Sequence, residues 1–272
     1  MIISRAERML NYLLLSVFAL FALYPLLSIV SAALAPPGQL PALLPTELTW
    51  GNLAEAWDLG RFGTYLRTSI VVSTSVVVLA TVFSVMAGYA FGTMHFRGSA
   101  VLFYVLLLGI MVPTEAIVVP LFFDLRDLGL TNTLLALVLP QTAQSVAFGT
   151  FWMRAYFRSS SRAMVEAARI DGAGHWRTLW SVLLPIGRPA MVTMIVLIFM
   201  WTWNEFLIPL VMVTDESLRT APLGLAFFQG QYTADFGLLA AGAAIVATPV
   251  VVVYLFLQRH FIRGMVEGAV KE

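Results

Sequence analysis

The chain has 272 residues, of which 60% are hydrophobic and only 11% are charged. Soluble domains carry about 25% charged residues, so this composition excludes an ordinary soluble protein and indicates a membrane protein. The formal net charge of +1 says little about partners, and no nucleic-acid partner is expected. The absence of cysteine excludes disulfides and thiolate metal sites. The three histidines lie far apart in the sequence, so no metal site is expected.

Six segments are long and apolar enough to cross a membrane, because a spanning helix needs about 20 mainly apolar residues. The sequence therefore predicts an all-α polytopic membrane protein with one transmembrane domain over residues 1–272. The first segment is longer than the apolar core of a signal peptide, about 7–15 residues, so we expect a retained helix. A proline-rich, irregular extracytoplasmic loop is expected over 35–64. The six expected spans are 10–34, 68–92, 100–123, 132–153, 190–213 and 237–258.

The distribution of basic residues predicts the orientation of these spans. If the N-terminus is cytoplasmic, 12 of the 16 lysines and arginines fall on the cytoplasmic side. Short cytoplasmic loops carry an excess of Lys and Arg. We therefore expect both termini, and the loop over 154–188, to lie in the cytoplasm. The four basic residues left outside are Arg61, Arg67, Arg126 and Arg219.

Two carboxylates, Glu115 and Glu205, lie within apolar runs. A charge at the centre of a membrane helix costs about 2.5–3.5 kcal/mol on insertion scales. Each must therefore face a cavity, take a partner or be protonated. A role in a translocation path and a structural hydrogen bond remain equally open, and Gln144 and Asn204 are further candidates for lining such a path. The neighbouring tryptophans at 201 and 203 could stack on sugar rings, but aromatic residues also commonly fill membrane helices, and we interpret both as packing residues.

A polar, arginine-rich segment, residues 154–188, lies between the apolar fourth and fifth spans; we call it the insert. We expect a short helix over 163–171, capped by Ser160 or Ser161 and ended by Gly172, since glycine suits the left-handed residue after a helix. A second short helix, over 175–184, should stop at Pro185.

Ala167 and Ala168 should leave one side of the first helix flat, beside a charged stripe of Arg162, Glu166 and Arg169 at helical spacing. We interpret this helix as a docking surface for a protein. An amphipathic helix resting on lipid headgroups would explain the arginines but not the arrangement of small residues.

The chain carries no sign of its own ATP site. Its single lysine is Lys271, so the Gly-Lys-Ser/Thr tripeptide of a phosphate-binding loop is missing. No nucleophile triad or general acid–base pair stands out either. We expect a non-catalytic subunit that binds no cofactor itself.

The insert resembles the EAA motif of ABC importer permeases. The matching residues are Glu166-Ala167-Ala168, then Gly172 after three intervening residues, and Val182-x-Leu184-Pro185, with Val182 where the family has Ile. The resemblance extends along most of the chain. Further matching segments, similar to carbohydrate-importer permeases of the maltose type, are Pro120-Leu121-Phe122, Leu128 to Thr133, Trp203 to Leu207, and the tail from Gly264 to Lys271.

The resemblance implies a division of labour among subunits. Two permeases would form one pathway, two ABC ATPase subunits would bind ATP and magnesium beneath them, and an extracytoplasmic sugar-binding protein would deliver a di- or oligosaccharide. The ATPase-coupling residues it implies are Glu166, Ala167, Ala168, Asp171, Gly172, Leu184 and Pro185.

Two rival hypotheses remain open from the residues alone. A secondary transporter could be driven by protons through Glu205, although it leaves the insert unexplained. A membrane scaffold could use the same docking surface without moving any solute.

Overall fold

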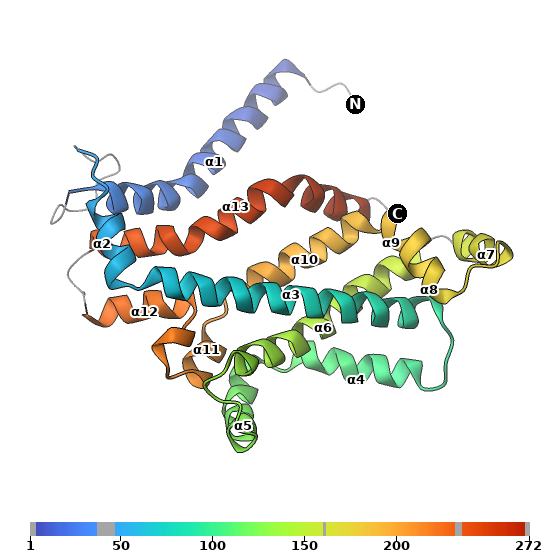
Figure 1. The fold of residues 1–272 in the computed structure, drawn as a ribbon. Coiled ribbons are helices and arrows are strands. Elements are labelled where there is room, and N and C mark those ends of the chain that lie inside the picture. Colours follow the sequence, from blue (N-terminus) through green and yellow to red (C-terminus); the bar gives the residue numbers. More distant parts are fainter. Residues whose placement is uncertain (1–3, 37–46, 160–161, 232–235, 270–272) are drawn as a thin grey trace. The chain divides into compact units, whose positions relative to one another are not determined.

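The computed structural model describes residues 4–36, 47–159, 162–231 and 236–269, and every regular element in these ranges is helical (Figure 1). Four of these helices are long and apolar enough to span a membrane, or up to six spans exist if each of two bent helix pairs counts as one. The predicted all-α polytopic fold class is therefore confirmed. Some residues considered above lie outside the described residues. They are the expected helix caps Ser160 and Ser161, two prolines of the expected loop, Pro41 and Pro45, and the single lysine, Lys271.

The chain divides into two compact units. Unit 1 comprises Met1–Gly63 and Gly224–Thr248, and unit 2 comprises Thr64–Leu223 and Pro249–Glu272.

Unit 1 begins with α1 (Arg5–Leu34), which starts earlier than the span expected at 10–34. Its start is set by a capping box: the Ser4 hydroxyl accepts from the Glu7 amide, and the Glu7 carboxylate accepts from the Ser4 amide. Most large apolar side chains of α1 are exposed. Exposure of this extent along a whole helix suits a surface that lies in lipid rather than water.

The expectation of an irregular loop over 35–64 is wrong, because the segment contains α2 (Gly51–Leu59). The prolines that suggested a loop all precede this helix, and its own nine residues include none. The buried Asn52 side chain donates to the Ala35 carbonyl at 2.8 Å and holds α2 against the end of α1. The unit also contains most of α12 (Ala221–Gln231) and the first part of α13 (Phe236–Ala269).

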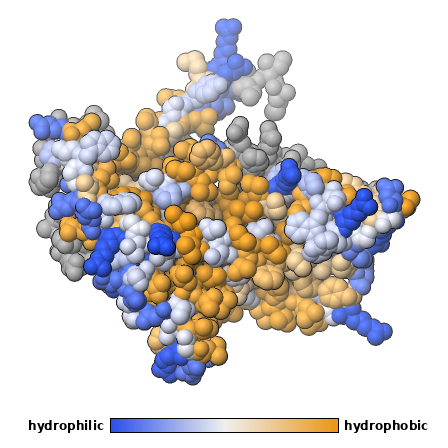
Figure 2. All heavy atoms as spheres, in the orientation of Figure 1, coloured by the Kyte–Doolittle hydropathy of each residue, from blue (hydrophilic) through white to orange (hydrophobic). Residues whose placement is uncertain are grey.

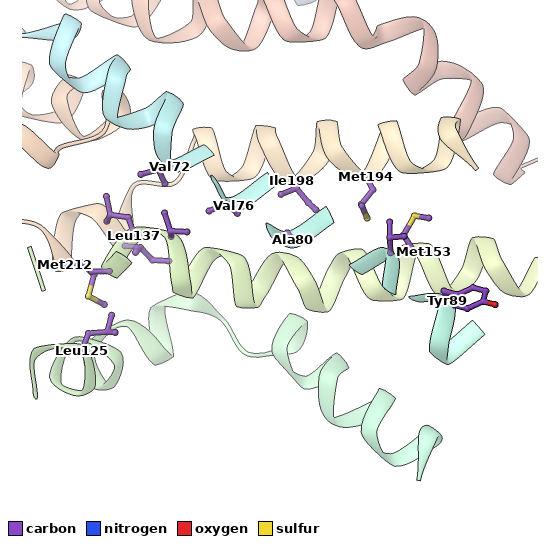
Figure 3. Close-up of a cluster of buried hydrophobic side chains, with 14 of the residues drawn as sticks. Val72, Val76, Ala80, Tyr89, Leu125, Leu137, Met153, Met194, Ile198 and Met212 are labelled. Atoms are coloured by element: carbon purple, nitrogen blue, oxygen red, sulfur yellow. The ribbon is translucent and has the colours of Figure 1, made fainter. Parts of the chain in front are cut away.

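The core of unit 2 lies among α3 (Phe62–Thr93), α6 (Leu134–Ser159) and α10 (Arg188–Trp203). Figure 3 shows its side chains pointing toward one another from these helices, with α5 and α11 closing one end. The labelled members of this cluster are Val72, Val76, Ala80, Tyr89, Leu125, Leu137, Met153, Met194, Ile198 and Met212.

Glycines let α3 and α6 approach closely at the end that leads to the insert. A Cβ atom on Gly88 would lie 2.6 Å from the Cβ atom of Met153, and one on Gly92 would lie 2.9 Å from that of Phe157. Gly149 of α6 meets Ser84 of α3 in the same way. Small residues at every fourth position permit such contact between membrane helices. The two helices are therefore held as one closely packed pair.

The expectation of one continuous helix over 100–123 is wrong, because the segment forms two helices. These are α4 (Ser99–Met111) and α5 (Thr114–Asp127), and their axes differ by 99°. The break falls at Pro113, which has no amide hydrogen and so cannot bond to the carbonyl of Gly109 one turn earlier. The apolar run is continuous across the break, which is why it suggested a single span.

The span expected at 190–213 is also wrong as a single helix, since it breaks between α10 and α11 (Leu207–Met212). Glu205 lies in the break and not in a helix interior. Its Oε1 atom accepts from the amide of Ile208 at 3.0 Å, which satisfies one of the free first-turn amides of α11. One structural partner of this carboxylate is thus a helix end.

Asn132 fastens the turn before α6 to the segment after α11. Its Oδ1 atom accepts from the amides of Thr214 at 2.7 Å and Asp215 at 3.0 Å, and its amide nitrogen donates to the Thr214 hydroxyl at 2.7 Å. Its φ of 58° is left-handed, a conformation in which asparagine is several-fold enriched. Asp215 also accepts from the amide of Ser217, which lowers the pKa of Asp215 and begins the short 3-10 helix η2 (Glu216–Leu218).

Replacing Asn132 by alanine is expected to destabilise unit 2 by about 1–3 kcal/mol, because it removes three exposed hydrogen bonds and strains the left-handed backbone. The thermal unfolding midpoint of the purified protein in detergent measures this. Asn132→Asp keeps the acceptor and is expected to lose less. Asn132→Gly keeps the backbone conformation but not the hydrogen bonds, so stability equal to wild type in that variant would show that the hydrogen bonds contribute nothing.

The insert folds as a chain of short helices at the end of α6. They are α7 (Arg162–Ile170), α8 (His175–Arg177), the π-helical η1 (Thr178–Leu183) and α9 (Leu184–Ile186). Figure 1 shows α7 and α8 at one end of α3 and α6, and α5 and α11 near the other. Within unit 2, Figure 2 shows hydrophilic side chains at the end that carries α7 and α8 and again at the tip that carries α5, with apolar side chains between them.

Candidate functional site

The helix α7 has an inner and an outer face. Val165 packs against the core of unit 2 and Ala168 is buried, whereas Glu166, Ala167, Arg169 and Ile170 are exposed. The outer residues recur three and four positions apart, which places them on one side of a helix. The side chain of Ile170 is 87% exposed. Ile170 lies one turn after Glu166 and next to Arg169, so this outer face is open to a partner.

The expected flat face formed by both alanines is wrong. Consecutive residues point about 100° apart on a helix of 3.6 residues per turn. Ala168 therefore packs inward, with 7% of its surface exposed, and only Ala167 is open to a partner.

Gly172 ends α7 as expected, with φ of 76°. Two hydrogen bonds complete the turn: the amide of Gly172 donates to the Arg169 carbonyl at 3.0 Å, and that of Ala173 donates to the Ala168 carbonyl at 2.8 Å. This is the pattern of a Schellman motif, in which a left-handed residue satisfies the last carbonyls of a helix. Asp171 is exposed beside it. The motif fixes the direction in which the chain leaves α7.

The second half of the insert is fastened to the long helices. The hydroxyl of the buried Tyr89, on α3, lies 3.2 Å from Nδ1 of His175. On α6, the hydroxyl of Tyr156 donates to the carbonyl of Leu183 at 3.3 Å. Just beyond the insert, the indole of Trp152 donates to the carbonyl of Ala190, in the first turn of α10, at 2.9 Å. A displacement of the insert must therefore be carried into α3 and α6.

The second helix does not stop at Pro185 as expected, but continues to Ile186. A π turn precedes the proline, with the amide of Leu184 donating to the carbonyl of Leu179 five residues back. The wider turn accommodates a residue without an amide hydrogen, so the helix continues. Leu184 is buried in the core of unit 2, whereas Pro185 is exposed.

A second candidate site is a pocket of about 280 Å³ in unit 2, between the two helix breaks. It lies next to the α4–α5 break and the α10–α11 break, and α6 forms its floor with Gln141, Gln144 and Ser145. The amide nitrogen of Gln144 donates to the hydroxyl of Thr114 at 3.1 Å, across the pocket wall. The structure thus places hydrogen-bonding side chains of α6 beside two interrupted helices.

Of the three candidate path residues, the structure brings together Gln144 and Glu205, which both line the pocket, and not Asn204. The Asn204 side chain instead donates to the carbonyl of Met200 at 2.7 Å and ends α10. Gln141 was missed by the sequence reasoning. Its signal was its spacing, since residues 141, 144 and 145 share one face of a helix.

Glu205 is the only ionisable residue among the described residues that line this pocket. Glu115 was the other carboxylate in an apolar run, but it is exposed in the first turn of α5 and does not line the pocket. Within the described part of the chain, no group of three His, Asp or Glu side chains is placed to hold a metal ion.

A protein-family model described as "Binding-protein-dependent transport system inner membrane component" matches residues 80–267. The chain is similar to the diacetylchitobiose uptake system permease protein NgcG of Streptomyces coelicolor, with 32% identity over 95% of this chain and 87% of that protein. It is also similar to the arabinooligosaccharides transport system permease protein AraQ of Halalkalibacterium halodurans, with 33% identity over 93% of this chain and 92% of that protein.

The fold is similar to a chain in the crystal structure of a bacterial ABC transporter involved in the import of the acidic polysaccharide alginate. The TM-score is 0.78 and the identity 25%, over 96% of this chain and 99% of that one. The predicted resemblance to importer permeases is confirmed by both comparisons. The chain therefore belongs to the family of inner membrane components of binding-protein-dependent transport systems, as a multi-pass transport subunit and not an enzyme.

Proposed function

We propose that this chain forms half of the translocation pathway of an ATP-driven importer for a neutral di- or oligosaccharide, delivered by an extracytoplasmic binding protein. A second permease completes the pathway, and two ABC ATPase subunits drive it. The names of the relatives support a carbohydrate substrate, because they are permeases for diacetylchitobiose and for arabinooligosaccharides. The basic-residue distribution supports cytoplasmic termini and a cytoplasmic insert.

The observation that carries the coupling role is the outer face of α7. Glu166, Ala167, Arg169 and Ile170 are exposed together, while the inner face and the following helices are fastened to α3 and α6. An ATPase subunit that binds this face can move α3 and α6. It does so only if it binds the inward-open and outward-open arrangements of the permease with different free energies. Asp171 and Gly172 set the exit from α7, and Leu184 and Pro185 end the segment that transmits the displacement.

A proton-driven mechanism through Glu205 is less well supported than ATP-driven coupling. One oxygen of Glu205 already accepts from the Ile208 amide, which gives the carboxylate a structural task. A scaffold without cargo is also less well supported, because the matched relatives are described as uptake or transport permeases.

The test is uptake by the complete importer in liposomes, with ATP enclosed and the binding protein outside. Labelled trehalose, diacetylchitobiose and arabinotriose are the neutral probes, and an alginate disaccharide is the acidic one. We expect ATP-dependent uptake of at least one neutral sugar that persists in the presence of a protonophore. Uptake that requires a proton gradient, or uptake of the acidic probe alone, would contradict the proposal.

A further inference from the structure

The pocket between the helix breaks contains a buried hydrogen-bond acceptor that has no partner. Gln141 is only 4% exposed, and its amide nitrogen donates to the Leu137 carbonyl at 2.9 Å. Its Oε1 atom has no hydrogen-bond partner among the described residues. A buried acceptor left unpaired costs about 1–3 kcal/mol. The Oε1 atom is closed off from the pocket as the structure stands, but Gln141 lines the pocket, so a rotation of its side-chain amide would present this acceptor to a ligand hydroxyl or amide hydrogen.

A second hydrogen-bond acceptor of the pocket is Glu205, which lies at the break between α10 and α11. Glu205 uses Oε1 to hold the Ile208 amide, which leaves Oε2 for a further donor. Because the helices are interrupted here, the carboxylate reaches the pocket without entering a helix interior. A charge at membrane depth must face protein or a water-filled cavity. The mouth of this pocket accordingly opens to water or to another subunit in the assembled importer.

An aromatic pair completes the lining. The rings of Phe148 and Trp201 are 4.6 Å apart between centroids and nearly perpendicular, and Trp201 is 52% exposed. Both residues line the pocket. Ligand sites combine apolar and aromatic walls with a few polar groups that fix orientation. Oxygen atoms that accept hydrogen bonds from hydroxyls, beside an exposed aromatic ring, suit a sugar. The hydroxyls of a sugar lie at the edge of its ring, and its C–H groups form an apolar face. This geometry revises the interpretation of Trp201 as a packing residue.

The charges and the size narrow the ligand class. Among the described lining residues no Lys, Arg or His is present, and Glu205 is acidic, so a uronate or a sugar phosphate would meet a like charge without a compensating cation. The volume of about 280 Å³ lies at the small end of ligand pockets, which measure about 300–1,000 Å³. The pocket has room for one ring and not for a whole oligosaccharide.

We infer that this pocket is a solute subsite of the subunit itself, which holds one uncharged sugar ring through Gln141, Glu205 and Trp201. The inference rests on the proposed function, since it concerns the cargo of that importer. It adds that this chain selects against acidic sugars, in contrast to the importer of similar fold that carries acidic alginate.

The native chain contains no cysteine, so a single introduced thiol reports on the pocket. Val112 lines the pocket and is 42% exposed. In the complete importer, with cysteine-free partner subunits, V112C is labelled with a small methanethiosulfonate reagent. The neutral sugar that the wild type transports should slow labelling by about tenfold at ten times its Kd. The alginate disaccharide should not. V119C is the matched control, because Val119 is 56% exposed on α5 and lies outside the pocket.

Uptake kinetics supply the second readout. E205Q keeps an acceptor for the Ile208 amide and Q141L removes the unpaired oxygen, so both should raise the KM for the neutral sugar by about tenfold, or about 1.4 kcal/mol. E115Q and Q258L are the controls, since neither residue lines the pocket. Should V112C fail to assemble, I110C replaces it, because Ile110 lines the pocket and is 45% exposed.

The outcomes separate this inference from the proposed function. If the wild-type importer moves none of the neutral sugars, the proposed carbohydrate function fails. Suppose instead that the importer moves one neutral sugar, but this sugar does not slow V112C labelling, and Q141L and E205Q have the wild-type KM. The proposed carbohydrate function is then upheld and the subsite inference is overturned. Equal protection by the alginate disaccharide would overturn the selection against acidic sugars.

Discussion

Gly172→Pro is expected to reduce sugar-driven ATP hydrolysis and uptake by about tenfold or more in the assembled importer. Proline holds φ near −65°, whereas Gly172 has φ of 76°. It also removes the amide that donates to the Arg169 carbonyl. The chain would leave α7 in another direction, so the outer face could not sit in an ATPase subunit while the second half remains fastened to Tyr89. ATPase activity with and without loaded binding protein measures the loss.

Two variants show whether the left-handed turn is responsible. Asn tolerates a positive φ, so Gly172→Asn should retain most of the coupling. Gly174→Ala changes a glycine two residues away, where φ is −69° and no atom lies within 4 Å of the added Cβ. It should behave like the wild type. Equal losses in all three variants would mean that any change in this loop disturbs assembly. They would contradict the claim that the left-handed backbone of Gly172 is what coupling requires.

Gly149→Ala is expected to destabilise unit 2 by about 1–3 kcal/mol, the usual cost of overpacking a tight contact. The added Cβ would collide with the Oγ atom of Ser84, lie 2.7 Å from its Cβ atom and lie 3.0 Å from Sδ of Met194. The thermal unfolding midpoint in detergent measures the change. Gly51→Ala is the control, because its Cβ would meet nothing within 4 Å.

A double mutant tests that the collision is with Ser84. In the background of Ser84→Gly most of the steric conflict is gone, and alanine is a better helix former than glycine by about 1 kcal/mol. Gly149→Ala should then cost little or should stabilise, giving a coupling energy of at least about 1 kcal/mol in the double-mutant cycle. Strictly additive effects would show that α3 and α6 do not pack as closely as the structure has them.

The sequence was sufficient for the features that depend on local chemistry. Apolar runs without charges predicted the membrane fold, and a glycine after a run of helix formers predicted where α7 ends. The resemblance of the segment from Glu166 to Pro185 to the EAA motif indicated the family. The docking face was predicted less well, because residue types do not show which side of a short helix its own protein covers. Tertiary packing buries Ala168 and exposes Ile170.

The pocket could not be predicted because it depends on two helix breaks that apolar composition does not show. Pro113 alone does not show that the axes of α4 and α5 would differ by 99°. Glu205 ends one break by holding an amide of the next helix, a contact that exists only in the folded chain. The spacing of Gln141 and Gln144 was visible, but its meaning required knowledge of what lies opposite.

The most direct test of the coupling role is whether the outer face of α7 touches an ATPase subunit. A cysteine introduced as I170C, at a position 87% exposed, is paired with single cysteines across the permease-facing surface of the ATPase in the complete importer. We predict a disulfide cross-link to the ATPase whose yield changes between ATP-bound and nucleotide-free states, whereas I186C, 54% exposed on α9, cross-links less. If I170C forms no cross-link to any ATPase position while the importer still transports sugar, the ATPase does not bind this face, and the proposed coupling role of α7 is wrong.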